Sequence, residues 1–301
     1  MKNNLFNGIR LTIEKKALNN ELKSIQARAN ELNKKANINA VGQLQIPFKE
    51  LRSVMSDSAS TKVQSFEITP TANVITRARM MEGLTSNAKY PIIKSNCSRW
   101  ENESGDTHTT DSVTLKPHRL YSEINYSDTL IRSTDETLQN ALTQDLLNDI
   151  YNKVESTLFA DSDETDGNPK GLFSMITPTE TTALTINVFA NAEKDFFKSG
   201  AKAPLFIFSP SAFAKAKESF KELFVNGRFD DVEYIVTNNM ADDYILLCDL
   251  SYLLVGSFGS LDVQVDDVTE KVSGKTRLLC NSFWDWNVTN DGAFQAIKLS
   301  A

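Results

Sequence analysis

The chain has 301 residues, of which 41% are hydrophobic and 24% charged, an ordinary composition for a soluble globular protein. Its length suffices for one large domain or two smaller ones. No run approaches the roughly 18 apolar residues of a membrane span, and the first residues lack the apolar core of a secretory signal. Cys97, Cys248 and Cys280 form no CxxC pair, so we expect reduced, buried thiols in a cytosolic product.

Charge is distributed unevenly along the chain. Residues 1–36 contain eight Lys/Arg and three Asp/Glu, a balance of +5, which leaves −12 on the rest of a chain with net charge −7. An acidic body disfavours nucleic-acid binding across its surface, because phosphate contacts need clustered Lys and Arg. We expect the basic segment either to meet an acidic protein or nucleic acid or to be a solvated, lysine-rich helix.

The basic segment also carries a heptad-like apolar pattern. Apolar residues recur over 11–36 at alternating steps of four and three, which predicts one helix with an apolar seam. A helix this polar is marginal alone in water, so the seam needs a partner, either another chain or its own domain. The seam residues that we assign to assembly are Leu18, Leu22, Ile25 and Leu32.

Residues 90–126 predict a long hairpin, with two extended arms around a polar tip. The alternation slips at Lys116-Pro117, which indicates a bulge or an unpaired edge. An arm of roughly fourteen extended residues spans about 45 Å, whereas a 200-residue domain has a radius of gyration of about 16 Å. The hairpin must therefore project, and it needs neighbours because a bare ribbon is barely stable. The candidate contact residues of the tip are Trp100, Glu101, Glu103, Asp106 and Asp111.

A long helix is predicted after the hairpin. Ser133-Thr134-Asp135-Glu136 is a capping box, and an apolar stripe then predicts a helix over 134–160. Further on, Ser209-Pro210 predicts a capped helix start between strand-like runs. The last two apolar runs are predicted to form a hairpin around Asn290-Asp291-Gly292, since Asp-Gly between alternating segments favours a tight turn.

Little in the sequence points to catalysis, cofactors or metals. His108 and His118 have no second ligand at metal-binding spacing, and no nucleophile-elbow motif is present. The stretch GNPKGLF, residues 167–173, differs from a phosphate loop because it follows a helix and its proline lacks an amide donor. We therefore expect no catalytic residue, no cofactor and no metal, and we interpret this stretch as a structural corner.

In their order, these segments resemble the tailed-phage major capsid proteins of the Hong Kong 97 type. The resemblance covers roughly residues 75–301. It rests on SRWENESGD at the hairpin, VTLKPHRLYSEINYSDTLIRS before the long helix, GNPKGLF after it, and then APLFIFSPSAFAKAKESFKE, NNMADDYILLCDLSYLLVG and DGAFQAIKL.

The resemblance implies an α+β fold with an N-terminal helix and arm, an extended β-hairpin loop, a peripheral domain with a long spine helix, and an axial domain. It implies a chain that self-assembles through pentamers and hexamers into an icosahedral shell. The implied segments are the basic N-terminal helix 1–40, the N-arm 41–89, the hairpin loop 90–126, the spine-helix part 127–174, the axial domain 175–255 and the C-terminal β part of the peripheral domain 256–301.

The same resemblance implies partners and a location. The partners would be further copies of the chain, portal, scaffold or head-completion proteins, and packaged double-stranded DNA enclosed without sequence-specific binding. The location would be the virion, assembled in the cytoplasm of the host bacterium, with no membrane contact.

Two features depart from the family's pattern. Only about 40 residues precede the arm, too few for the cleaved scaffolding domain of some members. The tip, Glu103–Ser112, has no lysine, so the Lys–Asn crosslinks of other members are not expected. Two alternatives remain open: the shell of an encapsulin-like compartment, which shares this fold, and an α+β enzyme with an unrecognised site.

Overall fold

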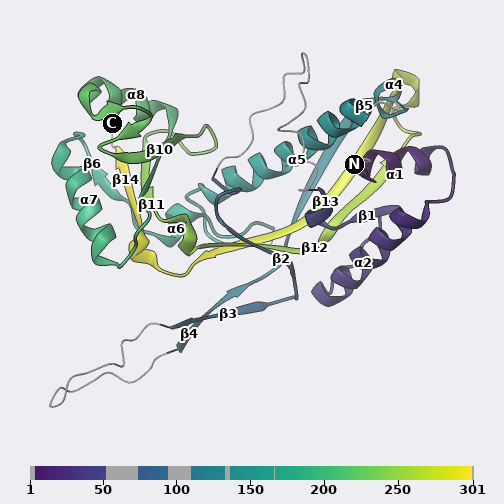
Figure 1. The fold of residues 1–301 in the computed structure, drawn as a ribbon, viewed down its shortest axis with the longest axis horizontal. Helices are drawn as coiled ribbons and strands as arrows, with labels where there is room; N and C mark the ends of the chain where they lie inside the picture. The colour runs from purple at the N-terminus through teal and green to yellow at the C-terminus, as the bar shows by residue number, and fades with distance from the viewer. Residues whose placement is uncertain (1–3, 52–73, 94–109, 133–135, 166, 300–301) are drawn as a thin grey trace.

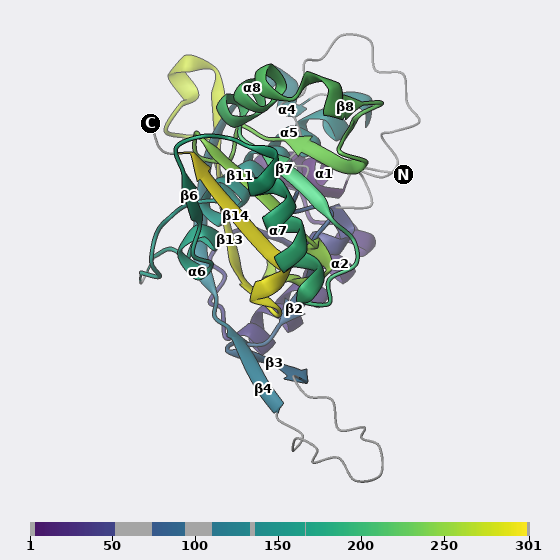
Figure 2. The same cartoon turned by 90° about the vertical axis from the view of Figure 1, so that its left-hand side faces the viewer.

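Two sheets and a projecting two-stranded ribbon organise the fold. The computed structural model describes residues 4–51, 74–93, 110–132, 136–165 and 167–299. Figure 1 shows the two sheets on opposite sides of the body, with a long helix running above the strands that connect them. The ribbon extends away from the body in both Figure 1 and Figure 2. None of the described helices is both long and apolar enough to cross a membrane.

The first sheet is built around two 14-residue strands, β12 and β13, which pair antiparallel. The pairing of β12 with β13 is irregular at one point, because its register shifts between Phe258 and Asp262 at a bulge. The sheet has the order β1 (Leu44–Ile46), β12 (Leu253–Asp266), β13 (Lys275–Val288) and β5 (His118–Ser127), with β2 (Arg79–Leu84) pairing parallel to β12.

The second sheet has buried apolar strands at its centre. Every residue of β7 and β11 is buried, as the apolar runs of the sequence predict. Helix α7 (Ile186–Lys198) lies across this sheet in Figure 2. The strand order is β6 (Thr179–Thr181), β14 (Phe294–Leu299), β11 (Tyr244–Cys248), β7 (Leu205–Phe208), β10 (Val232–Val236), β9 (Arg228–Phe229) and β8 (Phe224–Val225).

Helix α8 (Pro210–Ser219) begins where the sequence predicts. The amide of Ala212 donates to the hydroxyl oxygen of Ser209 (3.4 Å), so Ser209 is the N-cap and Pro210 occupies the first turn. The remaining short elements are the 3-10 helices η2 (Lys221–Leu223), η3 (Leu250–Tyr252), η4 (Lys271–Ser273) and η5 (Asp291–Ala293).

The predicted hairpin at Asn290–Gly292 is wrong, because β13 and β14 belong to different sheets. The amide of Thr289 donates to the carbonyl of Tyr252 (2.9 Å), and the side-chain amide of Asn290 donates to the carbonyl of Ser199 (3.1 Å). These bonds direct the chain through η5 into the second sheet, where β14 lies between β11 and β6. Residues 256–301 therefore do not form one unit as expected, since their last strand completes the other sheet.

The predicted single helix over 11–36 is also wrong: two helices, α1 (Asn4–Ile13) and α2 (Asn20–Ala36), replace it. Lys15 has a left-handed φ of 53°, which is incompatible with a continuing helix. Asn19 then caps α2 by accepting a hydrogen bond from the Leu22 amide (2.8 Å).

The predicted hairpin over 90–126 is shorter than expected. Strands β3 (Ala88–Ile93) and β4 (Thr110–Leu115) form the ribbon, whereas β5, the rest of the expected second arm, pairs with β13. The slip at Lys116-Pro117 marks the point where the chain leaves the ribbon. The predicted arm is divided there because β5 has a buried sheet edge to pair with.

The long helix α5 (Glu136–Leu158) follows the short α4 (Asp128–Arg132) and agrees with the predicted 134–160 apart from its ends. Residues 133–135 of the capping box lie outside the described residues. In its second half α5 is buried on most sides; the buried side chains are Leu146, Leu147, Asn148, Ile150, Tyr151, Val154, Glu155 and Leu158. The helix therefore lies inside the body of the molecule.

The stretch after α5 is a corner, as interpreted from the sequence. The indole of Trp286 donates to the carbonyl of Lys170 (2.7 Å). Phe173, in α6 (Leu172–Met175), stacks on Tyr244 of β11 with ring centroids 4.3 Å apart. The corner thereby joins the end of α5 and both sheets.

We expect Gly171→Ala to destabilise the chain, because a Cβ at Gly171 would overlap the backbone carbonyl of Ala160. Backbone atoms on both sides cannot move freely, so the cost should reach at least about 2 kcal/mol. Urea unfolding followed by circular dichroism measures it. Gly167→Ala is the matched control, since a Cβ there meets nothing within 4 Å; equal stability of the two variants would contradict the corner's role.

Candidate assembly surfaces

Within the described residues, a small cluster near the base of the ribbon attaches it to the body. This apolar cluster contains Ala36 of α2, Leu115 of β4 and Phe258 of β12, all buried, with Ala88 and Val113 packed against it. Farther out, Lys89, Pro91 and Asp111 are exposed. A two-stranded ribbon without a covering layer is marginally stable in water. The outer ribbon is therefore a surface that a partner would stabilise.

A groove separates the ribbon from the ends of the two sheets. Its volume is about 970 Å³, and its walls include Tyr90 of β3 and the segment Thr289–Gly292. The guanidinium of Arg79 lies over the Tyr90 ring, 5.2 Å from its centroid. The groove is large enough to accept a protein segment.

The first sheet has one face that its own chain covers incompletely. On one face, Ser122 and Tyr126 of β5 bond to side chains of α5. On the other, the loop after α2 covers β12, but β5 presents Arg119, Tyr121 and Glu123 to solvent. Tyr121 is 49% exposed, an unusual exposure for a large aromatic side chain in a sheet. This uncovered face is the second candidate contact surface.

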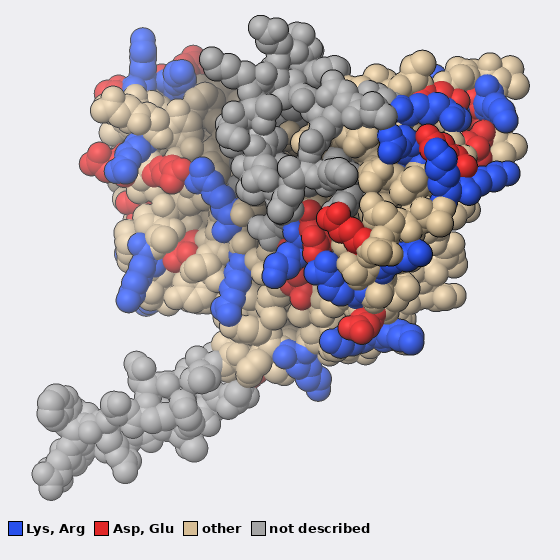
Figure 3. All heavy atoms as spheres, turned by 45° about the vertical axis from the view of Figure 1, so that its right-hand side comes forward, with Lys and Arg blue, Asp and Glu red and all other residues tan. Residues whose placement is uncertain are grey.

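Lys and Arg side chains do not form a single basic patch on the face drawn in Figure 3, where acidic and basic residues are interspersed. Elsewhere, charges of opposite sign pair directly; half-buried Arg277 of β13, for example, contacts Asp266 (2.7 Å) and Glu123 (3.3 Å). A mixed surface does not provide the continuous positive field that binds nucleic acid along a phosphate backbone.

The assembly residues predicted from the sequence fall into three groups. Asp111 is exposed on β4, at the outer part of the ribbon. Leu22 and Ile25 of the seam are buried against the chain's own first sheet, and Leu32 and Leu18 are half-buried. Trp100, Glu101, Glu103 and Asp106 lie outside the described residues.

The expectation that the seam binds another chain is therefore wrong for Leu22 and Ile25. Residues buried in the same chain cannot form an interface without unfolding it. The alternative partner, the helix's own domain, is the one the structure has.

Sequence reasoning missed a set of buried carboxylates that hold remote segments of backbone. Glu155 of α5 is fully buried, and its Oε2 accepts bonds from the amides of Val74 (3.1 Å) and Ile75 (3.4 Å). Its Oε1 accepts from the hydroxyl of Thr237 (2.7 Å) and from the side-chain amide of Asn239 (3.2 Å). One side chain thus joins α5, the segment before β2 and the second sheet.

Asp262 and Asp249 act in the same way. Asp262 of β12 accepts from the amides of Val41 (3.0 Å) and Gly42 (2.9 Å), which fixes the segment after α2. Asp249 accepts from the amides of Lys202 (3.2 Å) and Ala203 (3.1 Å). Burial opposes ionisation of Asp249, but the bonds from Ser251 and these amides keep its pKa below the ordinary value. No periodic pattern in the sequence identifies such residues.

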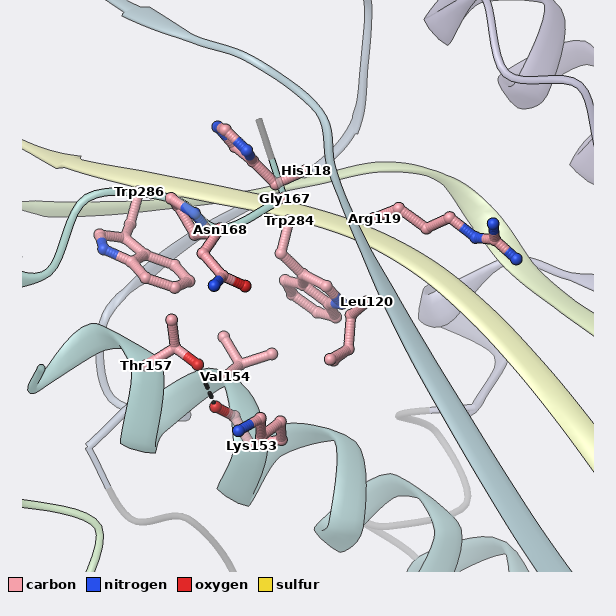
Figure 4. A pocket seen from close by; sticks show the side chains of 11 residues that line it. His118, Arg119, Leu120, Lys153, Val154, Thr157, Gly167, Asn168, Trp284 and Trp286 are labelled. Atoms are coloured by element: carbon pink, nitrogen blue, oxygen red, sulfur yellow. Dashed lines mark hydrogen bonds between the residues drawn. The ribbon is translucent and has the colours of Figure 1, made fainter. Parts of the chain in front are cut away.

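A small cavity lies between α5 and the corner, walled by the rings of Trp284 and Trp286 and by Val154 and Thr157 (Figure 4). Its volume of about 40 Å³ has room for a few water molecules and is too small for an organic cofactor. Among the described residues no group of three or more His, Cys, Asp or Glu side chains could hold a metal ion. Burial raises the pKa of the Cys280 thiol to about 12 and also raises that of Cys248, so neither is a ready nucleophile.

A model of the phage capsid family matches residues 67–299 of the chain. No curated protein matches it in a sequence search. Among solved structures, the chain is similar to the capsid of an empty GTA particle (TM-score 0.59, 15% identity, covering 82% of this chain and 98% of that one). It is also similar to a chain from Gordonia phage Cozz (TM-score 0.58, 10% identity, 80% and 90% covered).

A further similarity is to the holo-SrpI encapsulin complex from Synechococcus elongatus PCC 7942 (TM-score 0.52, 12% identity, 81% and 94% covered). At these identities the likenesses establish the fold. They agree with the α+β capsid fold expected from the sequence.

We expect Glu155→Gln to lower the free energy of unfolding by about 1–3 kcal/mol. Glutamine has the same shape, but its NH₂ group would face N–H or O–H groups that now donate to a carboxylate oxygen. Chemical denaturation of the full chain measures the change. Glu218→Gln, at an exposed position of α8, is the matched control and should be neutral. A neutral Glu155→Gln would show that the carboxylate does not hold the three segments together.

Proposed function

Because the chain belongs to the phage capsid family, it is a capsid shell protein, and we propose that its copies close through pentamers and hexamers into an icosahedral shell around packaged double-stranded phage DNA. The observation that supports this proposal most directly is the coexistence, on one chain, of a ribbon that projects beyond the body and a sheet face that the chain covers only in part. The family and fold point to a structural protein, and we propose no catalytic residue.

The two surfaces favour a head-to-tail contact between copies. The ribbon and the uncovered face of β5 are different surfaces, so contact between them is heterologous. A heterologous contact generates rings when its rotation closes and open filaments when it does not. We propose that the ribbon of one copy lies on the first sheet of the next, and that closure at five or six copies gives the capsomers.

The tip residues remain part of this proposal. Trp100 would supply an aromatic anchor, and Glu101, Glu103, Asp106 and Asp111 would meet Lys or Arg of a neighbour. Such exposed pairs contribute about 0–1 kcal/mol each and weaken with salt. Obligate interfaces bury several thousand Å² (on the order of 2,000–5,000), and a subunit held at several contacts cannot leave without breaking them together. We propose that the shell is held non-covalently.

We assign the domain roles by this function. The first sheet with α5 would be the peripheral domain, and the second sheet, β14 included, would be the axial domain whose loops surround the capsomer axis. With Leu22 and Ile25 packed inside the chain, residues 1–36 would act in assembly through their basic side chains and not through the seam.

The remaining partners are part of the same proposal. Portal, scaffold and head-completion proteins would join the shell during assembly in the cytoplasm of the host bacterium. The net charge of −7 and the mixed surface suit a wall that encloses DNA without gripping it. A second candidate, an encapsulin-like compartment, is favoured only by the similarity to the encapsulin complex. Nucleic acid in particles purified from the native source supports the phage shell, and a protein cargo without nucleic acid supports the compartment.

We expect replacement of residues 94–109 by Asn-Gly to leave a folded chain that forms no closed shells. The deletion lies beyond the cluster of Leu115 and Phe258 that anchors the ribbon, so the body should keep its melting temperature. Negative-stain electron microscopy of the purified chain tests this prediction. The control replaces residues 94–109 by a Gly/Ser segment of the same length. It distinguishes the effect of shortening the ribbon from the effect of removing its side chains. Normal particles from the shortened chain would contradict the ribbon's proposed role.

A further inference from the structure

The ribbon is joined to the body by two short links. Residues 85–87 connect β2 to β3, and Lys116-Pro117 connects β4 to β5. Proline fixes its own φ and restricts the residue before it, so the second link has few conformations. The angle between ribbon and body is therefore determined by these links together with the cluster of Ala36, Leu115 and Phe258, and any interaction with Lys116, the neighbour of Leu115, bears directly on it.

Two carboxylates from different parts of the body hold Lys116. Its backbone amide donates to Oδ2 of Asp285 on β13 (2.7 Å), whose Oδ1 accepts from the Trp286 amide (2.8 Å). Its side-chain Nζ donates to Oε1 of Glu164, in the segment after α5 (2.9 Å). Backbone and side chain of one link residue are thus fastened to two separate elements.

We propose that Lys116-Pro117 is a hinge of the ribbon, and that Asp285 and Glu164 form a latch that sets the ribbon's angle to the body. The unlatched ribbon would sample other angles while β5 stays paired with β13. The latch is a property of the single chain. Only its use, the adjustment of contacts between neighbouring copies, rests on the proposed function.

The charged groups around the latch are few among the described residues. Asp285 faces the Lys116 amide, with His118 and Glu164 close by. Glu164 faces Lys116 and also His118, whose Nε2 lies 3.7 Å from Oε1. Lys170, from the corner, adds a further positive charge and pairs with Asp163 (3.4 Å).

These surroundings give the two halves of the latch different pH ranges. Burial raises the pKa of Asp285 to about 6, although the Lys116 and Trp286 amides act to lower it. Protonation makes Asp285 a weaker acceptor for the Lys116 amide, so this charge-assisted bond weakens as the pH falls through about 6. The hydrogen bond from Lys116 lowers the pKa of Glu164, so that half persists at more acidic pH.

Pulsed EPR on the unassembled full chain tests the proposal. Spin labels on Lys89→Cys of β3 and Ala190→Cys of α7, both at exposed positions, report the ribbon's angle. Cys97→Ser removes a native cysteine that the spin label could modify, and the other two native cysteines, Cys248 and Cys280, are buried. Measurements at about pH 7.5 and about pH 5 bracket the pKa of about 6.

The reference is the labelled chain with Glu164 intact at the higher pH. Relative to it, the latch predicts a shifted or broader distance distribution in Glu164→Gln at the same pH. It predicts a similar change in the chain with Glu164 intact at the lower pH. The combination of both should show the largest change. Glu233→Gln is the matched control, since Glu233 also makes one exposed ion pair, with Arg77 (2.6 Å). In hydrogen exchange, the protection factor of the Lys116 amide, which is the intrinsic rate at each pH divided by the observed rate, should be roughly tenfold smaller at the lower pH, as expected for loss of one bond to a charged acceptor.

Distributions that stay the same in Glu164→Gln and at both pH values would overturn the latch, as would an equal change in Glu233→Gln. Because the chain is measured unassembled, this result would leave the shell function untouched. Conversely, a chain that fails to form shells but shows the predicted shifts would keep the hinge and reject the proposed function.

Discussion

Buried carboxylates that accept backbone amides from remote segments hold this molecule together. Burying a carboxylate costs free energy unless its oxygens accept hydrogen bonds, and burying an amide without an acceptor costs free energy as well. A hydrogen bond between the two groups removes both costs. Glu155 joins α5 to the second sheet, Asp262 fixes the chain after α2, and Asp285 fixes the base of the ribbon. These contacts connect segments that lack a common strand or helix. They therefore decide how the two sheets and the ribbon are placed relative to one another.

The sequence predicts the elements whose signals are local. The apolar stripe after residue 136, the cap at Ser209 and the corner before Leu172 all appear where the periodicity and the turn residues indicate. The predicted contact surface could be located only in part, at Asp111 on the ribbon.

Interactions between distant residues could not be predicted in this way. The assignment of β14 depends on an open edge beside β11, and that of β5 on the edge of β13. The break between α1 and α2 does have a local signal, the N-cap residue Asn19. The heptad pattern runs across it and therefore predicted one helix. Glu155 and Asp262 have no sequence signature at all, because their partners lie 80 or more positions away.

The place of β14 has a consequence for synthesis of the chain. This strand, residues 294–299, lies between β6 and β11, which are made more than forty residues earlier. Until it emerges from the ribosome, β11 has a bare edge, and β6 lacks the strand beside which it lies. The second sheet therefore closes only after nearly all of the chain described here has been translated. A nascent or truncated chain would retain an open β edge, which other chains can pair with, so incomplete copies would be prone to aggregate.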